Sequence, residues 1–287
     1  MSDPLDRRLN AFRPDLADIR LQGRVEAEHY VAGETRTVSD AVLDLRDHPN
    51  PDSSIGTQAL LGERVTVFDE KDGLAWIQLQ DDHYVGYVNA TGLVPAAGVP
   101  THVISVPRTF VYAEADLRSP VTMACSMGGR LTPVATTTTR GTDYCLLEQG
   151  GAVIAAHIAA LPPAAPDYVS VAALFLQTPY LWGGTSGFGL DCSGLVRLSM
   201  ALCGRIVPRD TDMQAASLGA EIDPGDDYAG LQRGDLVFWK GHVAIAEDRD
   251  MAIHASGHTM QVVREPIREA IDRIAHLYDR PVCVRRP

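Results

Sequence analysis

The sequence contains no long apolar stretch. Nowhere does it approach the roughly 18 consecutive apolar residues of a membrane-spanning helix. Its N-terminus, MSDPLDRRLNAFRPDLADIRLQG, is rich in charge and lacks the apolar core of a secretory signal peptide. These absences predict a protein with neither a membrane span nor an export signal, and therefore a cytoplasmic one.

Cysteine is scarce, and its spacing suggests no pairing. Five cysteines are scattered along 287 residues, an odd number without close pairs, and no Cys-x-x-Cys zinc pattern occurs. This usage predicts a reducing compartment and no disulfide framework. We expect Cys125, Cys145, Cys203 and Cys283 to be ordinary core or surface thiols.

An excess of positive charge is also missing. Asp and Glu number 37 and Lys and Arg 25, which gives a formal net charge of -12 and a pI near 5.1. This balance argues against nucleic acid or an anionic membrane as a partner, and it is compatible with a cationic or zwitterionic substrate. A hydrophobic content of 45% over 287 residues indicates a globular chain of two or three domains.

The stretch that is rich in signal is TPYLWGGTSGFGLDCSGLV (178–196), in which five glycines fall between Gly183 and Gly194. Cys192 directly precedes a run with helical periodicity that Gly204 would end. A thiol at a helix N-terminus has a lowered pKa and is more often the reactive thiolate. The alternative for Cys192 is a small buried apolar residue.

Two histidines follow on a predicted β-hairpin. HVAIA (242–246) and MAIHAS (251–256) alternate in polarity and are joined by turn residues near Asp248. Side chains alternate along strands, so His242 and His254 would project from the same face, opposite or diagonal to each other. Together with Cys192 they suggest a nucleophile, a base and an orienting group.

These segments resemble the NlpC-type cysteine peptidases of bacterial cell-wall metabolism, which have a reduced papain-like fold. The blocks YLWGGTSGFGLDCSGL, RGDLVFWKGHVAIA and AIHASG carry the resemblance, which covers roughly Pro166 to Arg286. It implies that Cys192 is the nucleophile, His242 the general base and His254 the orienting residue, without any cofactor. A zinc site made of the same three side chains is the alternative, and catalysis is the favoured interpretation.

The same resemblance implies residues that contact the substrate. Tyr180 would donate a hydrogen bond to the oxyanion or the substrate carbonyl, or else be a core aromatic. Trp182 would pack under the glycine loop or form a wall of the pocket. Asp191 and Ser193 flank the nucleophile and would contact the N-terminal end of the substrate. Thr211 lies in a segment that borders the cleft in the family.

Three further local structures are expected around these blocks. YVSVAALFLQT (168–178) has the spacing of a helix, and EPIREAIDRIAHLY (265–278) has helical spacing as well. PVCVRR (281–286) is typical of a closing strand. In PRDTDMQ (208–214), Asp210 is expected mainly to cap a helix.

The N-terminal half is predicted to be all-β. We expect an arm over 1–36 and two small modules, 37–97 and 98–163, that resemble bacterial SH3-like barrels. The modules repeat at about 66 residues, so that Gly62 corresponds to Gly128 and YVNATGLV (87–94) to VIAAHIAAL (153–161). The threonine run 136–139 is expected to be an exposed loop. With the peptidase domain at 166–287, after the Pro/Ala linker LPPAAPD (161–167), the fold class is α+β.

Two β modules followed by an NlpC-type domain resemble the γ-D-glutamyl-L-diamino acid endopeptidases. These cleave muropeptides with a free N-terminal L-Ala, between D-Glu and L-Lys or diaminopimelate, so the resemblance implies murein recycling. The first module would select the free amine and contribute Tyr84 of HYVGYV. Relatives often carry an acid before the T-Q-x-L-x-G-E segment, where this chain has Ile55 and Gly56. Glu63, Asp52 or Asp191 would have to replace it.

Two other classes of function stay open from the residues. The same site could serve an acyltransferase or an amidase on a substrate outside the cell wall. A non-catalytic peptide-binding protein is the third hypothesis, and the set of Cys192, His242 and His254 argues against it, because a binding module needs no nucleophile.

Overall fold

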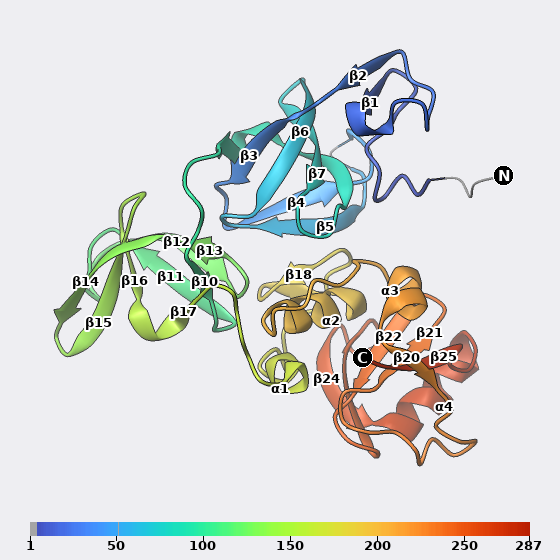
Figure 1. The fold of residues 1–287 in the computed structure, drawn as a ribbon. Coiled ribbons are helices and arrows are strands. Elements are labelled where there is room, and N and C mark those ends of the chain that lie inside the picture. The colour runs from blue at the N-terminus through green and yellow to red at the C-terminus, as the bar shows by residue number, and fades with distance from the viewer. Residues whose placement is uncertain (1–4, 51) are drawn as a thin grey trace. The chain divides into compact units, whose positions relative to one another are not determined.

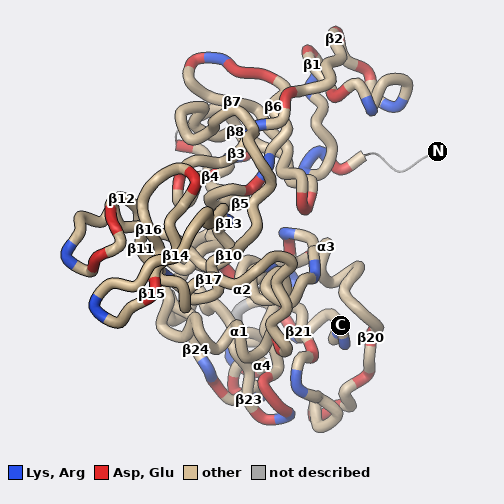
Figure 2. The backbone as a smooth tube through the Cα atoms, turned by 60° about the vertical axis from the view of Figure 1, so that its left-hand side comes forward, with Lys and Arg blue, Asp and Glu red and all other residues tan. Residues whose placement is uncertain are grey.

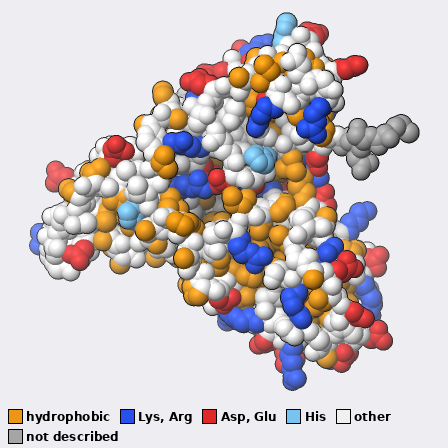
Figure 3. Space-filling view, viewed as in Figure 1, with side chains coloured by type: hydrophobic (Ala, Val, Ile, Leu, Met, Phe, Trp, Pro, Cys, Tyr) orange, Lys and Arg blue, Asp and Glu red, His pale blue; other side chains and the backbone are white. Residues whose placement is uncertain are grey.

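The computed structural model describes residues 5–50 and 52–287, and its two compact units divide between Leu161 and Pro162. This division falls within the Pro/Ala-rich segment predicted as a linker. Among the described residues, no helix combines the length and the apolar character needed to cross a membrane. In Figure 2, acidic and basic residues alternate along the backbone, and on the face shown in Figure 3 the Lys and Arg side chains of the described residues form no continuous area.

The N-terminal unit begins with a short parallel pair of strands and then forms a seven-stranded sheet in the order β5-β4-β8-β7-β6-β3-β9 (Figure 1). Its elements are β1 (Leu16–Asp18), η1 (Ile19–Leu21), β2 (His29–Val31), β3 (Glu34–Val38), β4 (Val42–Arg46), β5 (Ile55–Leu60), β6 (Arg64–Lys71), β7 (Leu74–Leu79), β8 (Val85–Asn89), η2 (Ala90–Gly92) and β9 (Leu93–Pro95). Strand β3 pairs with β6 and β9, so the sheet begins at Glu34 and not at residue 37 as predicted. Residues 1–4 of the predicted arm lie outside the described part.

The rest of this unit consists of a three-stranded and a five-stranded sheet. The elements are β10 (His102–Ile104), β11 (Arg108–Tyr112), β12 (Val121–Ser126), β13 (Arg130–Leu131), β14 (Pro133–Thr139), β15 (Thr142–Leu147), β16 (Ala152–Ile154), η3 (Ala155–His157) and β17 (Ile158–Ala160). The prediction of a loop at 136–139 is wrong, because these threonines belong to β14 and pair with β15. Threonine is β-branched and favours extended backbone.

The two halves of this unit share a local pattern. Each has a strand, a 3₁₀ turn and a short strand in succession: β8-η2-β9 in one and β16-η3-β17 in the other. Gly62 and Gly128, the glycines matched in the predicted repeat, both have positive φ, at 76° and 90°. The halves also have separate apolar cores, one around Ile77 and the other around Val153. These features support an internal duplication; the closure of each half into an SH3-like barrel stays a prediction.

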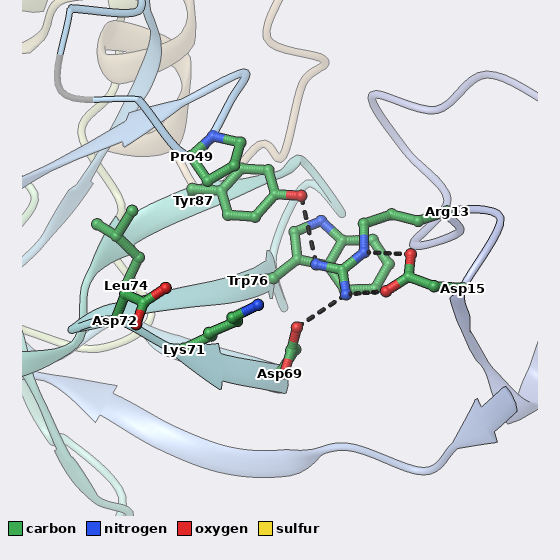
Figure 4. A pocket seen from close by; sticks show the side chains of 9 residues that line it. All are labelled: Arg13, Asp15, Pro49, Asp69, Lys71, Asp72, Leu74, Trp76 and Tyr87. Carbon is green, nitrogen blue, oxygen red and sulfur yellow. Dashed lines mark hydrogen bonds and ion pairs between the residues drawn. The ribbon is translucent and has the colours of Figure 1, made fainter.

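A pocket of about 430 Å³ lies on the seven-stranded sheet (Figure 4). The guanidinium of Arg13 covers the ring of Trp76, 4.4 Å from its centroid. It donates to the carboxylates of Asp15 and Asp69, each at 2.8 Å, and to the hydroxyl of Tyr87 at 3.3 Å. One arginine thus fixes the N-terminal segment to the sheet.

The C-terminal unit is a six-stranded antiparallel sheet in the order β20-β25-β21-β22-β23-β24, accompanied by four helices (Figure 1). Its elements are α1 (Tyr168–Ala173), β18 (Thr185–Ser186), β19 (Gly189–Leu190), α2 (Cys192–Ala201), α3 (Thr211–Ser217), β20 (Ala220–Ile222), β21 (Leu236–Trp239), β22 (His242–Ala246), β23 (Met251–Ser256), β24 (Gln261–Pro266), α4 (Ile267–Leu277) and β25 (Cys283–Arg286). The buried helix α2 packs against β22 and β23. The hairpin at 242–256 and the closing strand agree with the sequence prediction.

Two of the predicted helices have different bounds in the structure. The helix expected over 168–178 ends at Ala173, because Gln177 adopts a φ of 69° and its N–H donates to Val262 of β24. The helical spacing at 265–278 begins in a strand, since Glu265 and Pro266 belong to β24. Helix α3 does follow Asp210, but the side chain of Asp210 makes no capping hydrogen bond to it.

Candidate active site

Helix α2 begins at Cys192, and the residue before it holds this start in place. The carboxylate of Asp191 accepts the N–H of Gly194 at 2.7 Å and that of Gly183 at 2.9 Å. Gly194 also packs closely against the backbone of Gly184, because a Cβ at position 194 would come within 2.1 Å of the carbonyl oxygen of Gly184. The glycines and the aspartate therefore fix how the loop leads into the helix.

Asp191 forms a buried ion pair with Arg209, whose side chain is only 1% exposed. The two guanidinium nitrogens lie 3.1 and 2.6 Å from the two carboxylate oxygens, and one of them also donates to Ser193 Oγ at 2.7 Å. Asp191 and Ser193 thus have a positioning role that the sequence did not predict. Their contact with substrate stays a prediction, and the charge of Asp191 is already balanced by a cation.

The thiol of Cys192 lies against the beginning of strand β22. Its Sγ is 3.9 Å from the carbonyl oxygen of Gly241, and the N–H of Val243 hydrogen-bonds to it. These two residues flank His242 in the chain. The structure therefore brings the predicted nucleophile to the strand that carries the predicted base.

Burial governs the charge states of both groups. Cys192 is 5% exposed, and burial, followed by the nearby charge of Asp191, raises the pKa of its thiol to about 12. The expectation of a lowered pKa from the helix N-terminus is therefore wrong for this site without substrate, because Asp191 already occupies the helix N-terminus and desolvation outweighs it. Burial, followed by the charges of His254 and Arg273, lowers the pKa of His242 to about 3. At neutral pH the thiol of Cys192 and the imidazole of His242 are therefore both uncharged.

The two histidines of the hairpin are in contact. Ile245 pairs with Ile253, which places His254 diagonal to His242. Nε2 of His242 lies 2.7 Å from Nδ1 of His254, and their rings meet edge to face. His254 thus contacts His242 directly, and its role as the orienting residue stays a prediction. Nδ1 is the nitrogen of His242 that this contact leaves for proton transfer.

Sequence reasoning missed the next two residues of this chain of contacts. Nε2 of His254 lies 2.5 Å from Oε1 of Glu265, and Arg273 donates to the same oxygen at 2.5 Å. Burial alone would raise the pKa of Glu265, but the hydrogen bond from His254 and the charges of His254 and Arg273 lower it. The alternation of QVVRE (261–265) was the available signal for a third strand, on which Glu265 follows the histidine hairpin.

The other predicted residues of this unit lie in different environments. Tyr180 is partly buried, and burial, followed by the charges of Cys192 and Asp191, raises the pKa of its hydroxyl, which therefore stays a donor at neutral pH. Trp182 is 66% exposed, so it does not pack under the glycine loop as one prediction held. Trp239, which is not one of the predicted site residues, is buried, and its ring lies beside that of His242. Thr211 is half-buried at the first position of α3.

Tyr84 belongs to the N-terminal unit, where it is 4% exposed and part of the apolar core of the seven-stranded sheet. Among the acids proposed to bind the substrate amine, Glu63 is buried and accepts the N–H of Leu60, and Asp52 is exposed. A different acid, Asp47, lies next to Gly56, the position at which relatives often carry an acid. Its Oδ1 is 2.5 Å from where a Cβ on Gly56 would be. The hydroxyl of Tyr84 lies 3.4 Å from the same point.

The predicted alternative of a zinc site does not fit the donor set. Nε2 of His242 and both nitrogens of His254 are engaged in hydrogen bonds within the protein. Within residues 5–50 and 52–287, no three His, Cys, Asp or Glu side chains are grouped so that they could hold a metal ion. The five cysteines, all in this described part, are free thiols.

Comparison with curated proteins finds peptidases among the relatives. The chain is 27% identical to the gamma-D-glutamyl-L-lysine dipeptidyl-peptidase of Bacillus cereus over 209 residues, which covers 65% of this chain and 60% of that protein. It is 38% identical to dipeptidyl-peptidase 6 of Lysinibacillus sphaericus over 90 residues, or 31% of this chain and 32% of that protein. The matched segments thus span 60% or less of these relatives' own length.

A solved structure has the same fold over most of the chain. The NlpC/P60 family protein of Bacillus cereus superposes with a TM-score of 0.72 at 22% identity and covers 88% of this chain and 99% of its own. Two family profiles also match: the bacterial dipeptidyl-peptidase SH3 domain at residues 45–93 and the NlpC/P60 family at residues 177–276. The chain therefore carries an SH3 domain of the bacterial dipeptidyl-peptidase type followed by an NlpC/P60 domain.

Proposed function

We propose that this protein is a cysteine peptidase that hydrolyses the bond between γ-D-Glu and L-Lys or diaminopimelate in muropeptides with a free N-terminal L-Ala. The observation that carries the proposal is the Cys192 thiol held against β22, the strand that carries His242 of the hydrogen-bonded pair His242 and His254. The name of the Bacillus cereus relative, a gamma-D-glutamyl-L-lysine dipeptidyl-peptidase, supports this bond, and the name dipeptidyl-peptidase 6 of the Lysinibacillus relative supports the release of a dipeptide.

In the reaction, the thiol of Cys192 gives its proton to His242 as the sulfur attacks the substrate carbonyl. Burial disfavours either charge alone, but the thiolate and the imidazolium arise together and stabilise each other. The N–H of Cys192, at the first helical position where no intrahelical acceptor exists, and the hydroxyl of Tyr180 would bind the oxyanion. His242 then protonates the leaving amine, and water, deprotonated by the same histidine, hydrolyses the thioester.

We place the recognition of the free amine on the first β module. A buried or partly buried ammonium needs a carboxylate partner. Asp47 is exposed and its carboxylate lies beside Gly56, where the family's acid is missing, close to the hydroxyl of Tyr84. Asp47 would therefore take the role that the sequence analysis sought in Glu63, Asp52 or Asp191. A free L-Ala amine exists only in peptides already released from the glycan, which fits murein recycling.

The test uses L-Ala-γ-D-Glu-diaminopimelate, its lysine counterpart and the N-acetylated form of each, with products identified by mass spectrometry. Release of L-Ala-D-Glu from the free-amine peptides, abolished by Cys192→Ala, is the expected result. Cleavage of the acetylated forms at the same rate would disprove the recognition of the amine while retaining the peptidase. No cleavage of any peptide would disprove the proposed substrate.

Asp47 can be tested in the same assay. Asp47→Asn keeps the shape of the side chain and removes its charge, so KM for the free-amine peptide should rise by about tenfold or more while kcat changes little. Asp52→Asn, which removes another exposed acid of this module, serves as the control. An unchanged KM in Asp47→Asn would rule out this carboxylate as the partner of the ammonium.

A further inference from the structure

The contacts behind His242 form one continuous line through three strands and a helix. His242 on β22 contacts His254 on β23, His254 contacts Glu265 on β24, and Arg273 on α4 donates to Glu265. His254 is 1% exposed, and its two ring nitrogens are both engaged in this line. Whether Glu265 donates or accepts the hydrogen bond to His254 therefore determines which nitrogens of both rings are protonated.

The direction of each hydrogen bond follows from Glu265. An ionised carboxylate has no proton to give, so it can only accept. The hydrogen bond from His254 and the charge of Arg273 keep Glu265 ionised, and Nε2 of His254 must then carry a proton.

The protonation of His254 in turn determines which nitrogen of His242 carries a proton. When His254 is neutral it has a single N–H, so with that proton on Nε2 it has a lone pair on Nδ1. That lone pair accepts a hydrogen bond, so the partner nitrogen, Nε2 of His242, must donate. A neutral His242 then has its own lone pair on Nδ1, the nitrogen that can take the proton of a thiol.

The opposite assignment would disable the base. If Nδ1 of His254 carried a proton, either in the other neutral tautomer or in the imidazolium, it would donate to Nε2 of His242, and the proton of a neutral His242 would then lie on Nδ1. In that state the nitrogen needed for the reaction is already protonated.

We propose that Glu265, held by Arg273, is a positioning residue that selects the tautomers of His254 and His242 and thereby keeps Nδ1 of His242 ready to accept a proton. The proposal rests on the proposed function for its catalytic consequence, but the arrangement of the protons is a property of the folded protein alone. Glu265 touches neither Cys192 nor, in the proposed reaction, the substrate; it acts through His254.

The direct test determines by NMR which ring nitrogens of His242 and His254 are protonated. Long-range ¹H–¹⁵N spectra of protein with ¹⁵N-labelled histidine should show Nε2 protonated and Nδ1 unprotonated in both His242 and His254, assigned by replacing each in turn. Glu265→Leu offers neither donor nor acceptor, and a second tautomer should appear in both rings. Glu265→Asp keeps a carboxylate that only accepts, and should retain the single tautomer.

Activity on the free-amine peptide gives the second readout. Glu265→Leu should lower kcat by on the order of 10²-fold or more, with KM changed by no more than about twofold, and Glu265→Asp should recover part of the loss. Glu247→Gln is the matched control. Like Glu265, Glu247 forms an ion pair with an arginine, in its case Arg264 of β24, and its side chain is 19% exposed against 20% for Glu265.

Several outcomes would overturn the proposal. Protonated Nδ1 in either ring of the wild-type protein contradicts it, as does an unchanged pair of tautomers in a folded Glu265→Leu variant. An equal loss of kcat in Glu247→Gln would show that the effect comes from the sheet and not from the histidines. If the wild-type protein cleaves none of the peptides, the proposed substrate fails, while the spectra still decide the role of Glu265.

Discussion

At Cys192 the helix N-terminus and the burial of the thiol act in opposite directions on its pKa. The helix would favour the thiolate, but Asp191 occupies the free N–H of Gly194 and adds a negative charge of its own. Burial then leaves the thiol protonated at neutral pH. The nucleophile is therefore activated by its base during the reaction and does not exist beforehand as a stable thiolate.

The alkylation of Cys192 by iodoacetamide should report this state. Its rate should be low at pH 7 and still rise with pH beyond pH 9, because burial raises the pKa of the thiol to about 12. The modified peptide is quantified by mass spectrometry in a protein with Cys203→Ala and Cys283→Ala, since these two thiols are only partly buried. A rate that is already constant between pH 5 and pH 8 would instead show a preformed ion pair with His242.

The ion pair of Arg209 with Asp191 should contribute strongly to the stability of the N-terminal end of α2. Arg209→Met leaves the Asp191 carboxylate buried without its cation, which costs about 3–5 kcal/mol of the free energy of unfolding. Denaturant unfolding measures the loss, and Arg205→Met, a change at an exposed arginine of the same loop, is the control. A loss below about 1 kcal/mol for Arg209→Met would mean that this pair does not hold the helix start.

Among the elements, the N-terminal segment is fixed to the seven-stranded sheet by Arg13. Arg13→Met removes the cation from the face of Trp76 together with its hydrogen bonds to Asp15 and Asp69, and should cost about 1–2 kcal/mol. It should also speed proteolysis within residues 5–33. Both effects are measured, by denaturant unfolding and by limited proteolysis.

Arg36→Met is the matched control for this change. Arg36 also bonds two carboxylates, those of Glu34 and Glu70, and its side chain is 24% exposed against 20% for Arg13. Both of its partners are largely exposed, so the loss should stay below about 1 kcal/mol. Equal losses in the two variants would mean that the aromatic ring contributes nothing.

At this scale, sequence patterns predicted the elements whose periodicity is strong and local. The hairpin of His242 and His254, helix α2 and the closing strand follow directly from alternation or helical spacing. Helix α1 was predicted too long, because its end is set by a contact between Gln177 and β24 that no local pattern records. The threonines of β14 were taken as a loop, although their β-branched side chains favour a strand.

The same division holds for the site. Cys192, His242 and His254 were predicted because each lies in a recognisable local motif. Glu265 was missed, because its contact with His254, 11 residues earlier, depends on the pairing of β24 with β23. Helical spacing placed Glu265 in a helix instead.

For the molecule as a whole, the lowered pKa of the half-buried His242 predicts a loss of stability in acid. The pKa of His242 is lowered to about 3 in the folded state, against about 6.5 in an unfolded chain. Between these values the unfolded state binds a proton that the folded state does not, so stability falls as the pH drops from about 6.5, by up to about 1.4 kcal/mol per pH unit. Above pH 6.5 this contribution is fully present.

The measurement compares urea unfolding of the wild-type protein and of His242→Asn at a series of pH values from 7 to 4. The free energy of unfolding should fall more steeply with decreasing pH in the wild-type protein. Parallel curves for the two proteins would show that His242 is protonated as easily in the folded state as in the unfolded one.

The contact that ends α1 also determines how the sheet of the C-terminal unit meets its surroundings. Residues 177–180 lie along β24, where Gln177 donates to Val262, Val262 to Thr178, and Tyr180 to Met260. The beginning of the outermost strand on that side, at Gln261 and Val262, is thus already paired, while the strand at the opposite edge, β20, has only three residues. An exposed sheet edge invites another chain to add a strand and aggregate. The segment that leads to the nucleophile therefore also covers the start of this edge, where another chain would otherwise be able to add a strand.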